Sequence, residues 1–298
     1  MAENPFVALA PQLASGRPLL LGADIEASLR QQGVDVAGPG ALGKLLRARP
    51  DLVEGHYEAE VAAGADVLFA LTSETTPRVL AQVGMAFRSA ALTSSMVDRA
   101  LEAAERSQQP VVVAGVLGGD SVAPLDVTTL VDEHSVHAAR LAAAGAGLIL
   151  ARGIASRTEL MAAVVAAATT GLPTWSVVEV DRNGRVLDND EPEAIVTLLE
   201  AAGASAVLFE TSVDNCEVLV QRYHRTWPLP VGLLIDALPG VSPAAWAETV
   251  GPLIPPWARM IGGGRDCTEA HTAALARWLQ REPRRLHPSH RPTANRPS

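Results

Sequence analysis

The sequence predicts an α/β protein folded as a single-domain (β/α)8 TIM barrel. Eight short apolar runs alternate with Ala-, Leu-, Glu- and Arg-rich segments of helical spacing. The segments "AAGADVLFA", "AAGAGLILA" and "AAGASAVLF" repeat a glycine between a helix and a strand. Aromatic residues are only 4% of the chain while 48% is hydrophobic, which is typical of parallel sheets covered by helices. An open doubly wound sheet gives similar local signals, but eight strand–helix units favour the closed barrel.

The predicted strands are apolar runs of five or six residues, the length of a buried parallel strand. They span residues 18–22, 66–71, 111–116, 147–151, 174–178, 206–210, 231–235 and 259–263. Segments 41–63 and 130–144 show the helical spacing most clearly. Gly64, Gly145 and Gly203 precede the second, fourth and sixth strands, where a left-handed glycine ends a helix tightly.

Three segments are expected: an N-terminal extension (1–17), the barrel (18–280) and a disordered Pro/Arg-rich tail (281–298). The net charge of −9 divides into −13 on residues 1–280 and +4 on the tail, and an acidic body repels nucleic acid. No apolar run is long enough to span a membrane, and the N-terminus lacks a signal-peptide pattern. Only Cys216 and Cys267 are present. We therefore expect a cytoplasmic protein with a small-molecule substrate and no nucleic-acid or membrane partner. A protein partner or a homo-oligomer stays open.

Charged residues follow most of the predicted strands, where the active sites of barrels lie. The acids are Asp24, Glu26, Glu74, Asp120, Glu179, Glu210, Asp236 and Asp266, and the bases are Arg152 and Arg265. Such an acidic mouth suits a cationic ligand or a hard metal ion such as Mg²⁺ held by oxygen.

Glu179, Glu210 and Asp236 are the predicted catalytic residues, as acid/base or cation-binding groups, because a carboxylate at the end of an apolar strand is costly unless it is paired or used. Arg152 and Arg265 are expected to orient an anionic end of the ligand, such as an amino-acid carboxylate. The predicted substrate-binding residues are Asp24, Glu26, Thr72, Asp120, Arg152, Thr211 and Arg265.

Two alternatives for these residues stay open. Arg152 would form a structural ion pair with Glu179 on the neighbouring strand. The "GGGRD" turn (262–266) would instead bind a phosphate through its backbone amides, with Arg265 adding charge.

The chain also resembles the homocysteine S-methyltransferase family, zinc-dependent (β/α)8 barrels that transfer a methyl group to a thiol. The similarity is carried mainly by "RARPDLVEGHYEAEVAAGADVLFALTSETTP" (47–77). Further matches are "LRQQG" after the first strand, "VVVAG" in the third, "PTWSVV" in the fifth, and "IGG" with a following Thr and His at the eighth.

The resemblance implies three zinc-binding cysteines, one in an "NC" pair after the sixth strand and two adjacent ones after the glycines of the eighth. This chain has Glu210-Thr211 and Gly264-Arg265 at those places. Thiolate-bound zinc is therefore not expected, no metal-binding residue is assigned, and any other cofactor is unknown.

We accordingly expect a divergent homocysteine S-methyltransferase-like enzyme that acts without thiolate-bound zinc on a small polar, amino-acid-like substrate. One alternative is a non-catalytic, ligand-sensing or partner-subunit barrel, so catalysis itself stays open. The other is a zinc-dependent thiol methyltransferase whose metal site is displaced to Cys216, Cys267 and His271.

Overall fold

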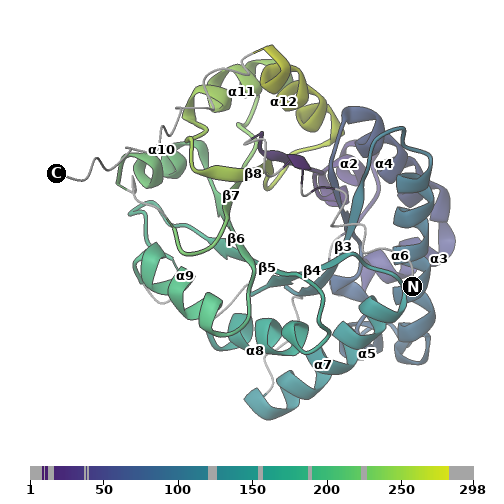
Figure 1. Cartoon of the computed structure of the whole chain (residues 1–298). Coiled ribbons are helices and arrows are strands. Elements are labelled where there is room, and N and C mark those ends of the chain that lie inside the picture. The colour runs from purple at the N-terminus through teal and green to yellow at the C-terminus, as the bar shows by residue number, and fades with distance from the viewer. Residues whose placement is uncertain are drawn as a thin grey trace.

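The chain folds as a closed barrel of eight parallel strands, each paired with its neighbours in sequence order (Figure 1). This computed structural model describes residues 9, 11–12, 17–36, 38, 40–119, 126–153, 157–186, 190–222 and 227–281. The strands are β1 (Leu19–Leu21), β2 (Val67–Ala70), β3 (Val112–Gly118), β4 (Leu148–Arg152), β5 (Thr174–Glu179), β6 (Ala206–Thr211), β7 (Val231–Ile235) and β8 (Ala258–Gly263). The predicted fold is confirmed, and each predicted strand is found within two residues of its expected bounds.

Helices surround the ring of strands in Figure 1. They are α2 (Ile25–Gln31), α3 (Ala41–Ala48), α4 (Pro50–Ala63), α5 (Pro77–Ala81), α6 (Ser89–Glu105), α7 (Val127–Ala143), α8 (Arg157–Ala168), α9 (Pro192–Ala201), α10 (Val213–Arg222), α11 (Pro243–Val250) and α12 (Glu269–Arg281). None of the described helices is long and apolar enough to cross a membrane.

The helix ends follow local chemistry. Asp126 begins α7 by accepting a hydrogen bond from the amide of Thr129, and Pro50 occupies the first position of α4. Gly64, Gly145 and Gly203 have φ angles of 96°, 99° and 105°, as their repeated position before a strand predicts.

Two apolar cores hold the barrel together. One fills its interior and includes Leu19, Val112, Leu150 and Trp175, so the barrel is packed and has no pore. The other lies between the strands and the helices and includes Trp246.

The extension before β1 is not separate from the barrel in its described part. Leu9 is only 1% exposed and belongs to the interior core. Gln12 and Arg17 both contact the carboxylate of Asp66, at 2.9 and 3.4 Å, and Asp66 also accepts a hydrogen bond from the amide of Leu20. The tail that is predicted to be disordered lies outside the described residues beyond 281.

The barrel closes where β8 pairs with β1, with Leu19, Leu20 and Leu21 opposite Met260, Ile261 and Gly262. Outside this seam α12 packs against α4 (Figure 1). A buried acid lies between the two helices: Glu60 of α4 is 1% exposed. Burial raises the pKa of Glu60 to about 8, with the Thr272 hydroxyl and the Ala23 backbone opposing the shift in part.

Two buried histidines lie on the inner face of α7. His134 and His137 are 0% and 1% exposed, and the Nε2 of His137 is 3.0 Å from the carbonyl oxygen of Thr72. Burial lowers the pKa of each, and at His134 the charge of Arg78 adds to the effect, so that both pKa values are about 4. Both side chains are therefore neutral at pH 7.

We expect His134 and His137 to lower the free energy of unfolding as the pH falls from 7 to 5, an effect that the raised pKa of Glu60 opposes. In the unfolded chain these histidines take up protons near their usual pKa of 6.5, whereas in the folded chain they do so only near 4. The contribution of each histidine is present above its unfolded pKa of 6.5 and is lost below it, by about 1–2 kcal/mol per histidine at pH 5. Urea titrations at several pH values measure this slope. The wild type should lose more stability than His137→Gln between pH 7 and 5, and equal changes in the two proteins would contradict the assignment.

Candidate functional site

A cavity of about 450 Å³ opens at the C-terminal ends of the strands. Leu150, Val177 and Leu234, from the apolar interior of the barrel, line its floor. The charged residues around it are Asp24, Glu26, Arg30, Glu74, Arg152, Glu179, Glu210, Arg265 and Asp266. The cavity therefore has an apolar base and a rim on which six carboxylates face three guanidinium groups.

The carboxylates of Glu179 and Glu210 come from residues that lie opposite each other on adjacent strands. Glu179 ends β5 and is paired in register with Glu210 on β6. Like charges on adjacent strands repel each other unless cations lie close to them. Each of the two glutamates has a different arginine as its partner.

Arg152, the last residue of β4, neutralises Glu210. Its Nη2 is 2.8 Å from Oε2 of Glu210, and its Nη1 is 3.5 Å from Oδ2 of Asp24. Burial alone would lower the pKa of Arg152, but the charges of Glu210 and Asp24 outweigh it and raise the pKa. The alternative pairing of Arg152 with Glu179 is wrong. Arg152 lies opposite Val177 in the sheet, two residues before Glu179, and the side chain of Glu179 meets Arg265 instead.

Arg265 connects the ends of β5 and β7. Its Nη2 is 2.8 Å from Oε1 of Glu179, and its Nε is 3.3 Å from Oδ2 of Asp236. Its amide donates a further hydrogen bond of 2.8 Å to Oδ1 of Asp236. Burial raises the pKa of Asp236 and the charge of Glu210 adds to the effect, whereas Arg265 opposes it.

The turn after β8 is held by bonds within the chain. The amide of Gly264 donates to the carbonyl oxygen of Ile235 at 2.8 Å, and the carbonyl oxygen of Arg265 accepts from the amide of Ala237 at 2.9 Å. Asp266 adopts a left-handed φ of 60°, which aspartate tolerates better than most residues. The amides of Gly264 and Arg265 are thus already engaged, which disfavours the phosphate-binding alternative.

Arg30 belongs to this rim although it was not predicted from the sequence. It lies on α2 four residues after Glu26 and contacts both Glu26 and Asp266 at 2.7 Å. The i,i+4 spacing of Glu26 and Arg30 is the signal that would have found it.

The rim acid Glu74 accepts a hydrogen bond of 2.8 Å from the amide of Gly40.

Three predicted substrate-binding residues, Thr72, Thr211 and Asp120, are not placed at the cavity by the structure. Thr72 is fully buried, and its hydroxyl bonds both the carbonyl oxygen and the amide of Val116, so it joins β2 to β3. Thr211 is also fully buried, and its hydroxyl donates to the carbonyl oxygen of Ser212. Neither is among the residues that line the cavity. Asp120 lies outside the described residues.

The model of the family described as homocysteine S-methyltransferase matches residues 20–279 of this chain. The chain belongs to the homocysteine S-methyltransferase family. This confirms the resemblance seen in the sequence. A search among curated proteins gives no match.

Solved structures agree with the fold of the family. The homocysteine methyltransferase MmuM from Escherichia coli in its metallated form is 23% identical, with a TM-score of 0.76 over 91% of this chain and 99% of that one. Its oxidized form is 24% identical, with a TM-score of 0.77 over 92% and 99%. The carboxyl transferase domain of Rhizobium etli pyruvate carboxylase is 13% identical, with a TM-score of 0.52 over 87% of this chain and 42% of that one. Identities this low show a shared barrel and no more.

The residues at the zinc positions of the family do not fit a thiolate-bound metal. A Cβ atom on Gly264 would lie 2.5 Å from Oδ1 of Asp236, so the aspartate occupies the space that a cysteine would need. The adjacent position holds the guanidinium of Arg265, whose positive charge repels a cation. Thr211, the third position, provides no thiol.

The two cysteines do not rebuild such a site in the described part of the chain. Cys216 and Cys267 are buried and free, and the thiol of Cys267 is 3.4 Å from the carbonyl oxygen of Ile235. The Nδ1 of His271 accepts a hydrogen bond from the amide of Thr268. The one metal-competent group found among the described residues contains none of these three side chains.

We expect Gly264→Ala to destabilise the protein by about 1–3 kcal/mol, because the added methyl displaces the Asp236 carboxylate from the Arg265 amide. Denaturant unfolding measures the change. In an Asp236→Gly background, Gly264→Ala should lower the free energy of unfolding markedly less, because the carboxylate that the added methyl would meet is gone. Equal costs in the two backgrounds would show that Asp236 does not fill this space.

Proposed function

We propose that the chain is a divergent homocysteine S-methyltransferase-like enzyme that acts without thiolate-bound zinc on a small polar, amino-acid-like substrate. The observation that carries this proposal is the convergence of Arg152, Glu179, Glu210 and Arg265 on one cavity with an apolar floor. The two free, buried cysteines fit the reducing cytoplasm, where we expect the protein to act.

The size and charge of the cavity support an amino-acid-like substrate. At about 450 Å³ the cavity falls within the usual range for small-molecule sites. An amino acid carries one positive and one negative group, and the rim offers partners for both within one ion-paired network. The excess of carboxylates over guanidinium groups favours a ligand whose net charge is not negative.

Each charged group has a distinct role in the proposal. The guanidinium of Arg152 is anchored by Glu210 and presents its remaining donors to a substrate carboxylate. The side chain of Glu179 is 53% exposed, which makes it the predicted catalytic carboxylate most accessible to a substrate ammonium or proton. Asp236, at 15% exposed, positions Arg265 through two hydrogen bonds.

The proposal predicts that α-amino acids bind the cavity and that both charged ends contribute. Calorimetric titration should show affinity for a zwitterionic amino acid, including thioether and thiol members, and a loss of about tenfold or more for the matching amine or the N-acylated acid. Arg152→Gln combined with Glu210→Gln removes the pair without leaving a buried charge, and should weaken zwitterion binding by a similar factor.

Arg49→Gln is a matched control, because Arg49 forms an exposed ion pair with Asp51 outside the cavity. Binding that survives the Arg152/Glu210 double substitution, or that ignores the substrate carboxylate, would contradict the proposal.

A ligand-sensing barrel without catalysis is the second candidate. It is favoured by the fact that Glu179, Glu210 and Asp236 are each paired with an arginine. Turnover separates the two candidates. Amino-acid binding with no methyl transfer to or from the bound ligand, across sulfonium and N-methyl donors, would support the sensor.

A further inference from the structure

We propose that His56, Glu60 and Glu269 form a zinc site outside the cavity, at the seam where the last helix of the barrel meets the first modules. His56 and Glu60 come from α4, and Glu269 is the first residue of α12. None of the three lines the cavity at the mouth. The proposal is independent of the proposed function.

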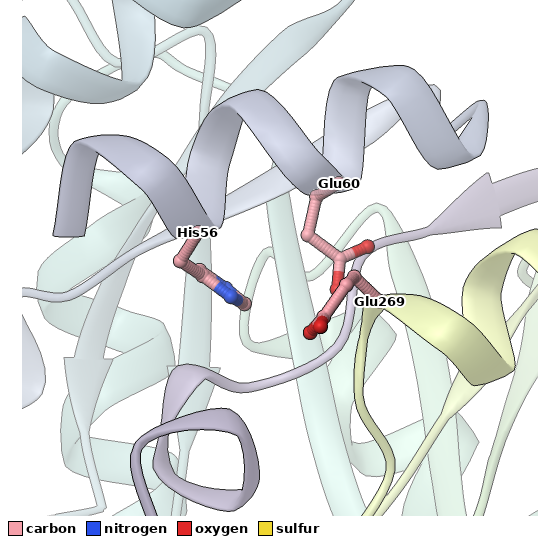
Figure 2. A group of neighbouring side chains, drawn as sticks. All are labelled: His56, Glu60 and Glu269. Carbon is pink, nitrogen blue, oxygen red and sulfur yellow. The ribbon is translucent and has the colours of Figure 1, made fainter. Parts of the chain in front are cut away.

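The geometry brings three donor atoms together. One nitrogen or carboxylate oxygen from each residue lies within 4.8 Å of the others. His56 and Glu60 are four residues apart, so they share one face of α4. In Figure 2 both point toward the carboxylate of Glu269.

Several buried polar atoms of this cluster make no hydrogen bond of normal geometry within the described chain. Both carboxylate oxygens of Glu60 and the Nδ1 of His56 are buried without a hydrogen bond, although these side chains are only 1% and 7% exposed. The hydroxyl of Thr272, one turn after Glu269 on α12, is also buried without a hydrogen bond of normal geometry, although it lies near enough to Glu60 to oppose the rise in its pKa. Unpartnered polar atoms at this depth are rare in folded proteins, and several aimed into one space indicate a missing ligand.

The donor set points to a divalent transition metal. An imidazole combined with two carboxylates suits Zn²⁺ better than Mg²⁺ or Ca²⁺, which prefer all-oxygen sites. In a zinc tetrahedron with bonds of about 2.0–2.1 Å, the ligand atoms lie about 3.4 Å from one another. The donor atoms here lie within 4.8 Å of one another, so movements of about an ångström by the side chains would close the site. The Ser28 hydroxyl donates a hydrogen bond of 2.6 Å to Oε2 of Glu269, which holds that ligand in place from α2.

The position of the site gives the metal a role. It lies beside the end of β1, since a Cβ atom on Gly22 would be 3.4 Å from Oε2 of Glu60. A metal here would bind α4 to α12 and so close the barrel between its first and last modules. We therefore expect it to stabilise the fold.

The full-length protein, stripped with a chelator and then equilibrated with Zn²⁺, should bind about one zinc per chain and gain thermal stability. Glu60→Gln and His56→Gln should each weaken zinc binding by on the order of tenfold or more and remove the gain. Glu60→Gln keeps the shape of the side chain and replaces a carboxyl that is mainly protonated at pH 7 by a neutral amide, so this variant is expected to fold. Circular dichroism checks that it does.

Glu58→Gln is the matched control, because Glu58 lies on the same helix with its side chain 51% exposed. The Co²⁺-substituted protein should show ligand-field bands without thiolate charge transfer. No zinc binding by the wild type, equal binding by Glu60→Gln, or a thiolate spectrum would each overturn the proposal. Preferential binding of Mg²⁺ would overturn the assignment to zinc.

Discussion

The mouth of this barrel depends on Arg265, which connects Glu179 at the end of β5 with Asp236 after β7. The amide and guanidinium of Arg265 both bond the Asp236 carboxylate, and this carboxylate fills the space beside Gly264. Once Arg265 holds Asp236 there, a side chain at position 264 collides with it and a cation beside it is repelled. The absence of thiols at positions 264 and 265 and the ion pairs of Arg265 are therefore parts of one arrangement.

The second arginine completes the charge balance. Glu179 and Glu210 are adjacent in the sheet, and the repulsion between their carboxylates would destabilise the fold without a cation nearby. Arg265 neutralises the first and Arg152 the second, so the two arginines are not interchangeable. The outcome is a water-accessible cavity with fixed charges of both signs above an apolar floor. Such a preorganised arrangement suits a ligand that carries both charges, as an amino acid does.

The strands and the family could be predicted from the sequence because local signals determine them: apolar runs, helix-ending glycines and an ungapped motif. Most of the rim could also be predicted, since residues after barrel strands converge. The partners could not, because whether Arg152 meets Glu179 or Glu210 depends on register and side-chain reach. Thr72, two residues after β2, and Thr211, the last residue of β6, are instead fully buried, and their hydroxyls bond backbone atoms. Glu60 and Glu269 are 209 positions apart, and only barrel closure brings them together.

The most direct test of this account is the zinc K-edge X-ray absorption spectrum of the wild-type protein equilibrated with one equivalent of zinc. Zinc–sulfur bonds of about 2.3 Å are readily distinguished from zinc–nitrogen and zinc–oxygen bonds of about 2.0–2.1 Å. The account predicts a shell of nitrogen and oxygen only, because Asp236 and Arg265 occupy the place of the thiolates. A sulfur shell would show that the cysteines of this chain still hold the metal, and would contradict the claim that ion pairs have replaced thiolate chemistry at the mouth.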